Sequence, residues 1–144
     1  MIRSEEEYQA TQQRLTDGKK NLAEQQAKLN AMGLDAAQQK RALDPMRSFM
    51  LQIEEELDAY ERLKRGEIGE LLNLHELGRT LVALRVAANI TQRELARRLK
   101  VDESQVSRWE RNEYHGITIE RAAAVMDALG ARVRTICEEI GLYA

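Results

Sequence analysis

The sequence predicts an all-α fold, in which an N-terminal helical hairpin precedes a compact domain of four or five short helices. Only 4% of the 144 residues are aromatic and one is proline, so the residues typical of β-sheets are scarce. Glu, Gln, Lys, Arg, Leu and Ala dominate the chain and favour helix. From residue 77 onward the apolar patterns become short, which indicates a second domain.

The composition also limits the classes of function. The 22 basic and 24 acidic side chains nearly cancel, so nucleic-acid binding would require a local basic surface. The sequence contains no apolar run of about 18 residues, and its acidic N-terminus is not a signal peptide. The single Cys137 excludes a framework of intramolecular disulfides. We therefore expect a soluble, cytoplasmic protein without membrane contact.

Residues 4–32 predict a first long helix. Ser4 is a suitable N-cap, and three glutamates follow in the positive first turn. An apolar stripe recurs every seven residues, but the second seam that a coiled coil requires is polar. The pattern therefore predicts a helix that leans on another element rather than a stand-alone zipper. The stripe comprises Tyr8, Leu15, Leu22 and Leu29, and the polar seam Thr11, Gly18 and Gln25.

A short helix beginning at Asp35 and a second long helix complete the predicted hairpin. Asp44 is placed as a cap and Pro45 as the first residue of the long helix, which should end near Gly66. Apolar residues then alternate at spacings of four and three, as in a coiled coil: Met46, Met50, Ile53, Leu57 and Tyr60. Residues 1–66 thus predict an antiparallel helical hairpin, for which a coiled coil in the strict sense stays open as an alternative. Its apolar stripes are expected to face each other or a partner chain. Residues 1–65 carry 11 basic and 12 acidic side chains, so this part is no nucleic-acid arm.

Two glycines within "RGEIGE" mark a boundary, and residues 67–76 are a linker or the start of a helix.

Residues 77–130 form the compact domain. Thr91 and Asp102 cap its second and third helices, and Glu94 and Gln105 complete capping boxes. The first helix, 77–89, presents an apolar stripe of Leu77, Leu81, Leu84 and Ala88. Thr118 caps a fourth helix that ends at Gly130, with Ile119, Ala123, Met126 and Leu129 in the core. The tail, 131–144, fits a short strand or extended segment, which can pair across a dimer, or a fifth helix.

The third helix is polar except for Val106 and Trp109. These two residues are three apart and share one face, so we expect Trp109 to point inward against Leu84, Leu95 and Leu99. The other faces then carry hydroxyl and charged side chains outward, as in a helix that reads the major groove of DNA. The segment 79–111 holds 8 basic and 4 acidic residues, a net charge of +4.

The stretch "LGRTLVALRVAANITQRELARRLKVDESQVSRWERNEYHGITIERAAAVMDALG" resembles the Cro/Xre-type helix-turn-helix family of phage and bacterial DNA-binding regulators, which have the lambda-repressor-like fold. The matching positions are Gln92, Leu95, Ala96, Val101, Val106 and Trp109. The resemblance implies that Gln92 bonds a phosphate, that Arg111 and Asn112 lie by the backbone, and that Arg85 pairs with Glu110 structurally. It also implies that Glu103, Ser104, Ser107 and Arg108 face base edges. Charge and position add Arg93 and Lys100 as phosphate contacts.

One position departs from the family pattern. The turn between the second and third helices usually has glycine where this chain has Lys100. If Lys100 adopts a positive φ, it is strained by roughly 1–2 kcal/mol. Otherwise the turn is rebuilt and tilts the third helix.

These patterns predict a homodimeric DNA-binding regulator, acting as a repressor on a near-palindromic operator in double-stranded DNA. The alternative is an antitoxin of the HigA-type arrangement, with the hairpin holding a toxin, and a third possibility is a protein-binding scaffold. The residues show no enzyme motif and imply no cofactor. His75, His115 and Cys137 lack the spacing of metal ligands.

Overall fold

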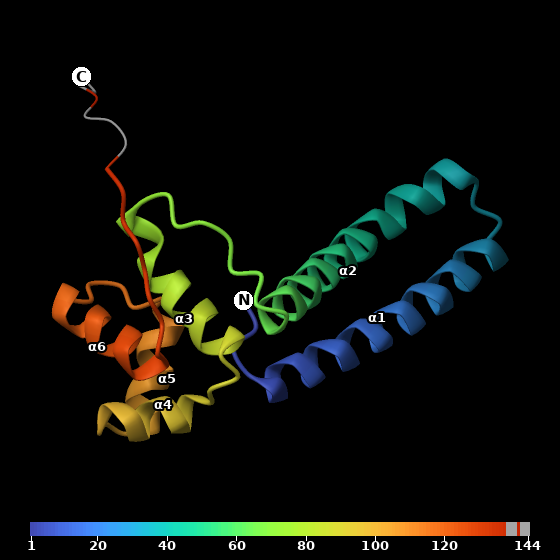
Figure 1. Cartoon of the computed structure of the whole chain (residues 1–144). Helices are drawn as coiled ribbons and strands as arrows, with labels where there is room; N and C mark the ends of the chain where they lie inside the picture. The colour runs from blue at the N-terminus through green and yellow to red at the C-terminus, as the bar shows by residue number, and fades with distance from the viewer. Residues whose placement is uncertain (138–140, 142–144) are drawn as a thin grey trace. The chain divides into compact units, whose positions relative to one another are not determined.

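The computed structural model describes residues 1–137 and 141, and the described chain is all-α (Figure 1), as predicted. The contacts divide it into two units, each of which is described by itself. One comprises Met1–Glu70 with Val86–Asn89, and the other Leu71–Arg85 with Ile90–Ala144. The elements are α1 (Glu5–Ala31), α2 (Ala36–Lys64), the 3₁₀ helix η1 (Leu74–Glu76), α3 (Leu77–Ala87), α4 (Gln92–Leu99), α5 (Glu103–Arg111) and α6 (Ile119–Leu129).

Helices α1 and α2 form the predicted antiparallel hairpin (Figure 1). Ser4 caps α1, since its hydroxyl accepts from the Glu7 N–H at 3.2 Å. The rings of Tyr8 and Tyr60 stack with centroids 4.9 Å apart. A buried apolar cluster forms in this unit, and burying it stabilises the pairing of the two helices. Its buried members are Ile2, Ile53, Leu57, Tyr60 and Val86.

The predicted break at Pro45 is wrong. Asp35 and Gln38 form a capping box, and one helix runs from there to Lys64 with Pro45 inside it. The apolar row of α2 explains the continuity, because Leu43, Met46 and Met50 keep the helical spacing of three and four across the proline. Leu43 is buried, and a break would take it out of that row. The loss of one backbone hydrogen bond at Pro45 is offset by this packing.

Two positions of the polar seam of α1, Thr11 and Gly18, are at least partly covered, whereas Gln25 is exposed. Thr11 is buried, and its hydroxyl donates to the Glu7 carbonyl at 2.7 Å. A Cβ atom on Gly18 would lie 3.4 Å from the Met50 Cγ. Small side chains at these two positions let the helices approach closely, and the hydroxyl of Thr11 is satisfied within its own helix.

The compact unit has a core drawn from all four of its α-helices. Its fully buried members include Leu81, Leu95, Val106 and Val125. Gly78 at the start of α3 packs directly against the chain after α5, because an added Cβ would lie 1.7 Å from the Glu113 carbonyl oxygen. Only glycine allows this approach without a shift of the backbone.

The predicted core faces of the first and fourth helices of the compact domain each include one residue that is in fact exposed. Ile119 is 76% exposed, and Ala88 is also exposed. In α6 the buried side chains are Ala122, Val125 and Leu129. The segment 119–129 is apolar at most positions, so its periodicity fits several rotations of the helix, and packing selects one of them.

Hydroxyl caps open two helices as predicted, with Thr91 accepting from the Glu94 N–H and Thr118 from the Arg121 N–H. The box at Thr91 is only half formed, because the Glu94 carboxylate accepts from Arg97 and Arg98 instead. The second predicted box is wrong. Asp102 is the N-cap of α5 but makes no side-chain cap bond, and its backbone carbonyl accepts from the Gln105 N–H.

The tail is neither helix nor strand over residues 131–137. The rest of the segment for which a strand or a fifth helix was predicted, residues 138–140 and 142–144, lies outside the described residues. None of the helices within residues 1–137 is long and apolar enough to cross a membrane.

Candidate nucleic-acid interface

The recognition-helix candidate α5 has one firmly buried face. Val106 is fully buried, and Ser104 and Arg108 are exposed. Ser107 is half-buried at the border between these faces. The nine residues of α5 therefore divide as a short amphipathic helix should, with hydroxyl and guanidinium groups directed away from the core.

Trp109 is half-buried rather than fully inward as predicted. Its ring packs against the core cluster, and the centroid lies 6.2 Å from that of Tyr114. The guanidinium carbon of Arg121 lies 4.8 Å from the Trp109 centroid, a cation–π distance. Trp109 thus anchors α5 from its edge, and Arg121 covers the part of the ring that the core leaves open.

Tyr114 is the core aromatic that sequence reasoning missed. It is 4% exposed although it lies in the loop after α5, with a φ of 53°. Burial raises the pKa of its hydroxyl, and the nearby Glu110 carboxylate adds to the effect. No periodicity could have identified Tyr114, because it lies outside any helix and is placed by left-handed backbone at Glu113 and Tyr114.

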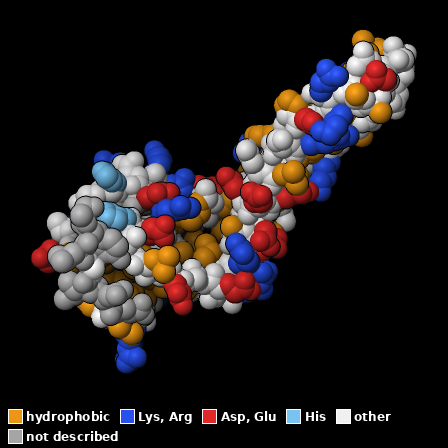
Figure 2. Space-filling model, turned by 90° about the horizontal axis from the view of Figure 1, so that it is seen from above, with side chains coloured by type: hydrophobic (Ala, Val, Ile, Leu, Met, Phe, Trp, Pro, Cys, Tyr) orange, Lys and Arg blue, Asp and Glu red, His pale blue; other side chains and the backbone are white. Residues whose placement is uncertain are grey.

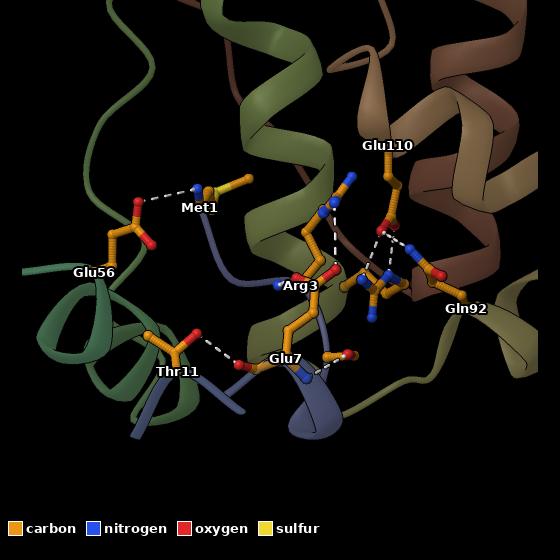
Figure 3. A network of polar contacts seen from close by, with 9 residues as sticks. Met1, Arg3, Glu7, Thr11, Glu56, Gln92 and Glu110 are labelled. Carbon is orange, nitrogen blue, oxygen red and sulfur yellow. Dashed lines mark hydrogen bonds and ion pairs between the residues drawn. The ribbon is translucent and has the colours of Figure 1, made fainter. Parts of the chain in front are cut away.

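A buried polar network joins α3, α4 and α5. Arg85 Nη2 donates to Glu110 Oε2 at 2.6 Å, and Arg85 Nη1 donates to the Ile90 carbonyl at 2.7 Å. Gln92 Nε2 also donates to Glu110 Oε2, at 2.7 Å (Figure 3). Arg85 and Glu110 are both almost fully buried. The network therefore holds the first residue of α4 to the end of α5 and sets the angle between the two helices.

The network bears directly on Gln92. Its amide nitrogen carries two N–H donors, and one of them is taken by Glu110. The side chain is half-buried, so the second donor is the one a phosphate would use. Gln92 is thereby oriented before any ligand binds.

Two of the predicted DNA-facing residues pair with each other. Arg93 Nε donates to Glu103 Oε2 at 3.0 Å, between the first turns of α4 and α5. Both side chains are exposed. The arginine reduces the negative charge that Glu103 would present to phosphates.

Lys100 has the left-handed backbone that the family pattern predicts for this turn, with φ 55° and ψ 45°. Its N–H bonds the Arg97 carbonyl at 3.2 Å, and the Val101 N–H bonds the Ala96 carbonyl at 3.0 Å. These bonds close α4 and redirect the chain into α5. The turn is not rebuilt to accommodate lysine.

Three cations remain available on this surface. Within residues 1–137, no ion pair is made by Lys100, Arg108 or Arg111, and all three are exposed. Asn112 follows as the exposed C-cap of α5. The ion pairs of Arg85, Arg93, Arg97 and Arg98 use acids of the same segment, 79–111, which the net charge of +4 already counts. Among the described residues, only Arg79 pairs with an acid beyond it, Glu113 at 3.6 Å.

Across the described residues, no cluster of three or more His, Cys, Asp or Glu side chains could hold a metal ion.

A comparison with family models matches residues 81–136 to the helix-turn-helix family. Neither the curated proteins nor the solved structures compared with the chain give a match. The matched residues contain α4 and α5 with the Lys100 turn between them, and most of α3 precedes them in the same match. The match covers residues 81–136 alone, and for that segment it indicates a DNA-binding regulatory domain. The family is not an enzyme family.

Residues 81–136 are, more narrowly, a helix-turn-helix domain of the Cro/Xre type. The resemblance found in the sequence is confirmed for this segment, which covers α3 from Leu81 through α6. The hairpin, α1 and α2, lies outside the match.

Proposed function

We propose that the protein is a sequence-specific transcriptional regulator that binds double-stranded DNA as a homodimer and represses by occluding a promoter. One observation carries the proposal. Helix α5 is held by buried Val106 and half-buried Trp109, while Ser104 and Arg108 are exposed next to cations that make no ion pair within residues 1–137. This is the arrangement that a helix needs to enter a major groove.

In the proposed complex, Arg108 and its neighbours select bases. A guanidinium can donate two hydrogen bonds to guanine, which contributes about 1–3 kcal/mol of discrimination. Ser104 and Ser107 add single hydrogen bonds to base edges or to the backbone. Glu103 already accepts from Arg93 through one carboxylate oxygen, so we expect its contribution to selectivity to be smaller than that of Arg108.

Phosphate contacts would set the register. Gln92 would use its second amide N–H, and the exposed Arg93, Lys100, Arg111 and Asn112 would contact further phosphates. Such contacts weaken steeply with added salt because bound counterions are released from DNA. In a dimer, two copies of α5 would enter successive major grooves about 34 Å apart.

Selection of bound sites from random double-stranded DNA tests this proposal. We expect a near-palindromic motif with half-sites about one helical turn apart, and affinity that falls steeply between low and moderate salt. A scaffold with no DNA function would enrich no motif and would bind DNA weakly at any salt concentration. That result would reject the proposal.

A further inference from the structure

The charges of the hairpin are segregated along its length. Gly18 of α1 packs on Met50 of α2, and this contact divides the hairpin into two halves. The proximal half, residues 1–18 and 50–66, has five basic and nine acidic side chains, a net charge of −4. The distal half, residues 19–49, has six basic and three acidic side chains, a net charge of +3. The net charge of the whole hairpin is close to zero because these two opposite charges nearly cancel.

The largest exposed apolar side chain of the hairpin lies close to the division. Phe49 is 51% exposed, and the guanidinium carbon of Arg14 lies 5.6 Å from its ring centroid. Phe49 and Arg14 therefore belong to one face of the hairpin, with α1 and α2 both contributing to it. Figure 2 shows basic and acidic side chains together with exposed apolar ones along the hairpin.

Charged residues extend this face in both directions from Phe49. By helical spacing, Lys28 lies on the Arg14 side of α1 and Arg41 on the Phe49 side of α2, both in the distal half. Glu6 and Glu56 lie on the same sides in the proximal half. All four are exposed. Among the described residues, Lys28, Arg41 and Glu6 make no ion pair, and Glu56 has only the terminal amine at 4.0 Å.

We propose that a second copy of this chain packs on the Phe49 face in antiparallel orientation, about a twofold axis close to Phe49. Such an axis places the distal +3 half of each hairpin against the proximal −4 half of the other. It also brings the two Phe49 rings together, because residues near a twofold axis meet their own copies. Parallel packing would instead oppose like charges along both halves. The inference rests on the proposed homodimer and specifies its interface.

Charge reversal in the whole 144-residue chain tests which charged halves face each other. We expect Lys28→Glu with Arg41→Glu, and separately Glu6→Lys with Glu56→Lys, to weaken self-association by roughly tenfold or more in sedimentation equilibrium. Mixing the two variants should restore association, since each reversed half then meets an opposite charge. Lys40→Glu in the distal half and Asp58→Lys in the proximal half are the controls. Both side chains are exposed, and each lies nine residues from Phe49, roughly 180° around α2. These changes should leave association unchanged.

Disulfide cross-linking in a Cys137→Ser background tests the antiparallel arrangement directly. A mixture of Arg41→Cys and Glu56→Cys chains should form the mixed 41–56 link in preference to either self-link, because Phe49 lies midway between these two positions of α2. Predominant 41–41 linking, or a wild-type chain that stays monomeric at all salt concentrations, would overturn the inference. DNA binding is measured separately by site selection. A monomer that selects a DNA motif would therefore overturn this interface and the homodimer, but not the reading of bases by α5. A dimer that selects no motif would overturn the proposed function, but not this interface.

Discussion

The hairpin and the compact unit are stabilised in different ways. In the hairpin, long helices share an extended apolar stripe, and its ion pairs, such as Lys19 with Glu54 at 2.9 Å, are exposed. In the compact unit, helices of eight to eleven residues are positioned by single features, namely the buried Arg85–Glu110 pair, the close approach at Gly78 and the left-handed Lys100. The comparison implies that single substitutions are tolerated in the first region and decisive in the second.

The largest difference should appear when an ion pair is broken. Glu110→Ala leaves the Arg85 guanidinium buried without its carboxylate, and we expect a loss of about 3–5 kcal/mol in the free energy of unfolding. Urea unfolding followed by the fluorescence of Trp109, the only tryptophan, measures the effect. In the hairpin, Glu54→Ala should cost less than about 1 kcal/mol by circular dichroism. Equal losses at the two positions would contradict the comparison.

Replacing glycine by alanine should change the free energy of unfolding in opposite directions in the two regions. Gly78→Ala forces a Cβ atom into the Glu113 carbonyl, and we expect it to cost about 3 kcal/mol or to displace the loop. Gly18→Ala places a Cβ at ordinary contact distance from Met50. Because alanine favours helix, that change should stabilise the hairpin by about 0.5–1 kcal/mol. A stabilising Gly78→Ala would show that the approach of α3 to Glu113 is wrong.

Left-handed positions offer a smaller test. Lys100→Gly relieves the strain of a side chain at φ 55° and should raise the stability of the compact unit by about 1 kcal/mol, seen as a higher melting temperature. Gly33, with φ 73° between the hairpin helices, is the reverse case, and Gly33→Ala should destabilise by a similar amount. An unchanged or lower melting temperature for Lys100→Gly would refute the strained turn.

The smallest effect concerns pH. Hydrogen bonds from Arg97 and Arg98 lower the pKa of Glu94 from 4.5 to about 2. The resulting stabilisation is therefore complete above pH 4.5 and is lost as the pH falls through about 2. Glu94→Gln should differ from the wild type near neutral pH and converge with it in acid, by a small amount because the group is exposed. If the stability difference between Glu94→Gln and the wild type grew as the pH fell, the direction assigned to the Glu94 pKa shift would be wrong.

Local patterns predicted much of the fold. The caps at Ser4, Thr91 and Thr118 and the end at Gly130 were readable, because each depends on a few neighbouring residues. The Arg85–Glu110 pair followed from the family resemblance rather than from spacing. The left-handed Lys100 was one of two alternatives that the resemblance left open.

What failed depended on contacts distant in sequence. Pro45 lies within a helix because Leu43 is buried, and the rotation of α6 is set by packing rather than by its nearly uniform apolar sequence. The Arg93–Glu103 pair and the bond from Gln92 to Glu110 likewise join residues at least ten positions apart. No helical periodicity encodes them.

The central claim is that α5 reads bases chiefly through Arg108, whereas Arg111 contacts the DNA backbone. Site selection with Arg108→Ala and Arg111→Ala, two identical changes three residues apart, tests it most directly. We expect Arg108→Ala to abolish the preference at one position of each half-site. Arg111→Ala should weaken all sequences equally and lower the slope of log affinity against log salt by about 1. A motif that survives Arg108→Ala intact would contradict the account.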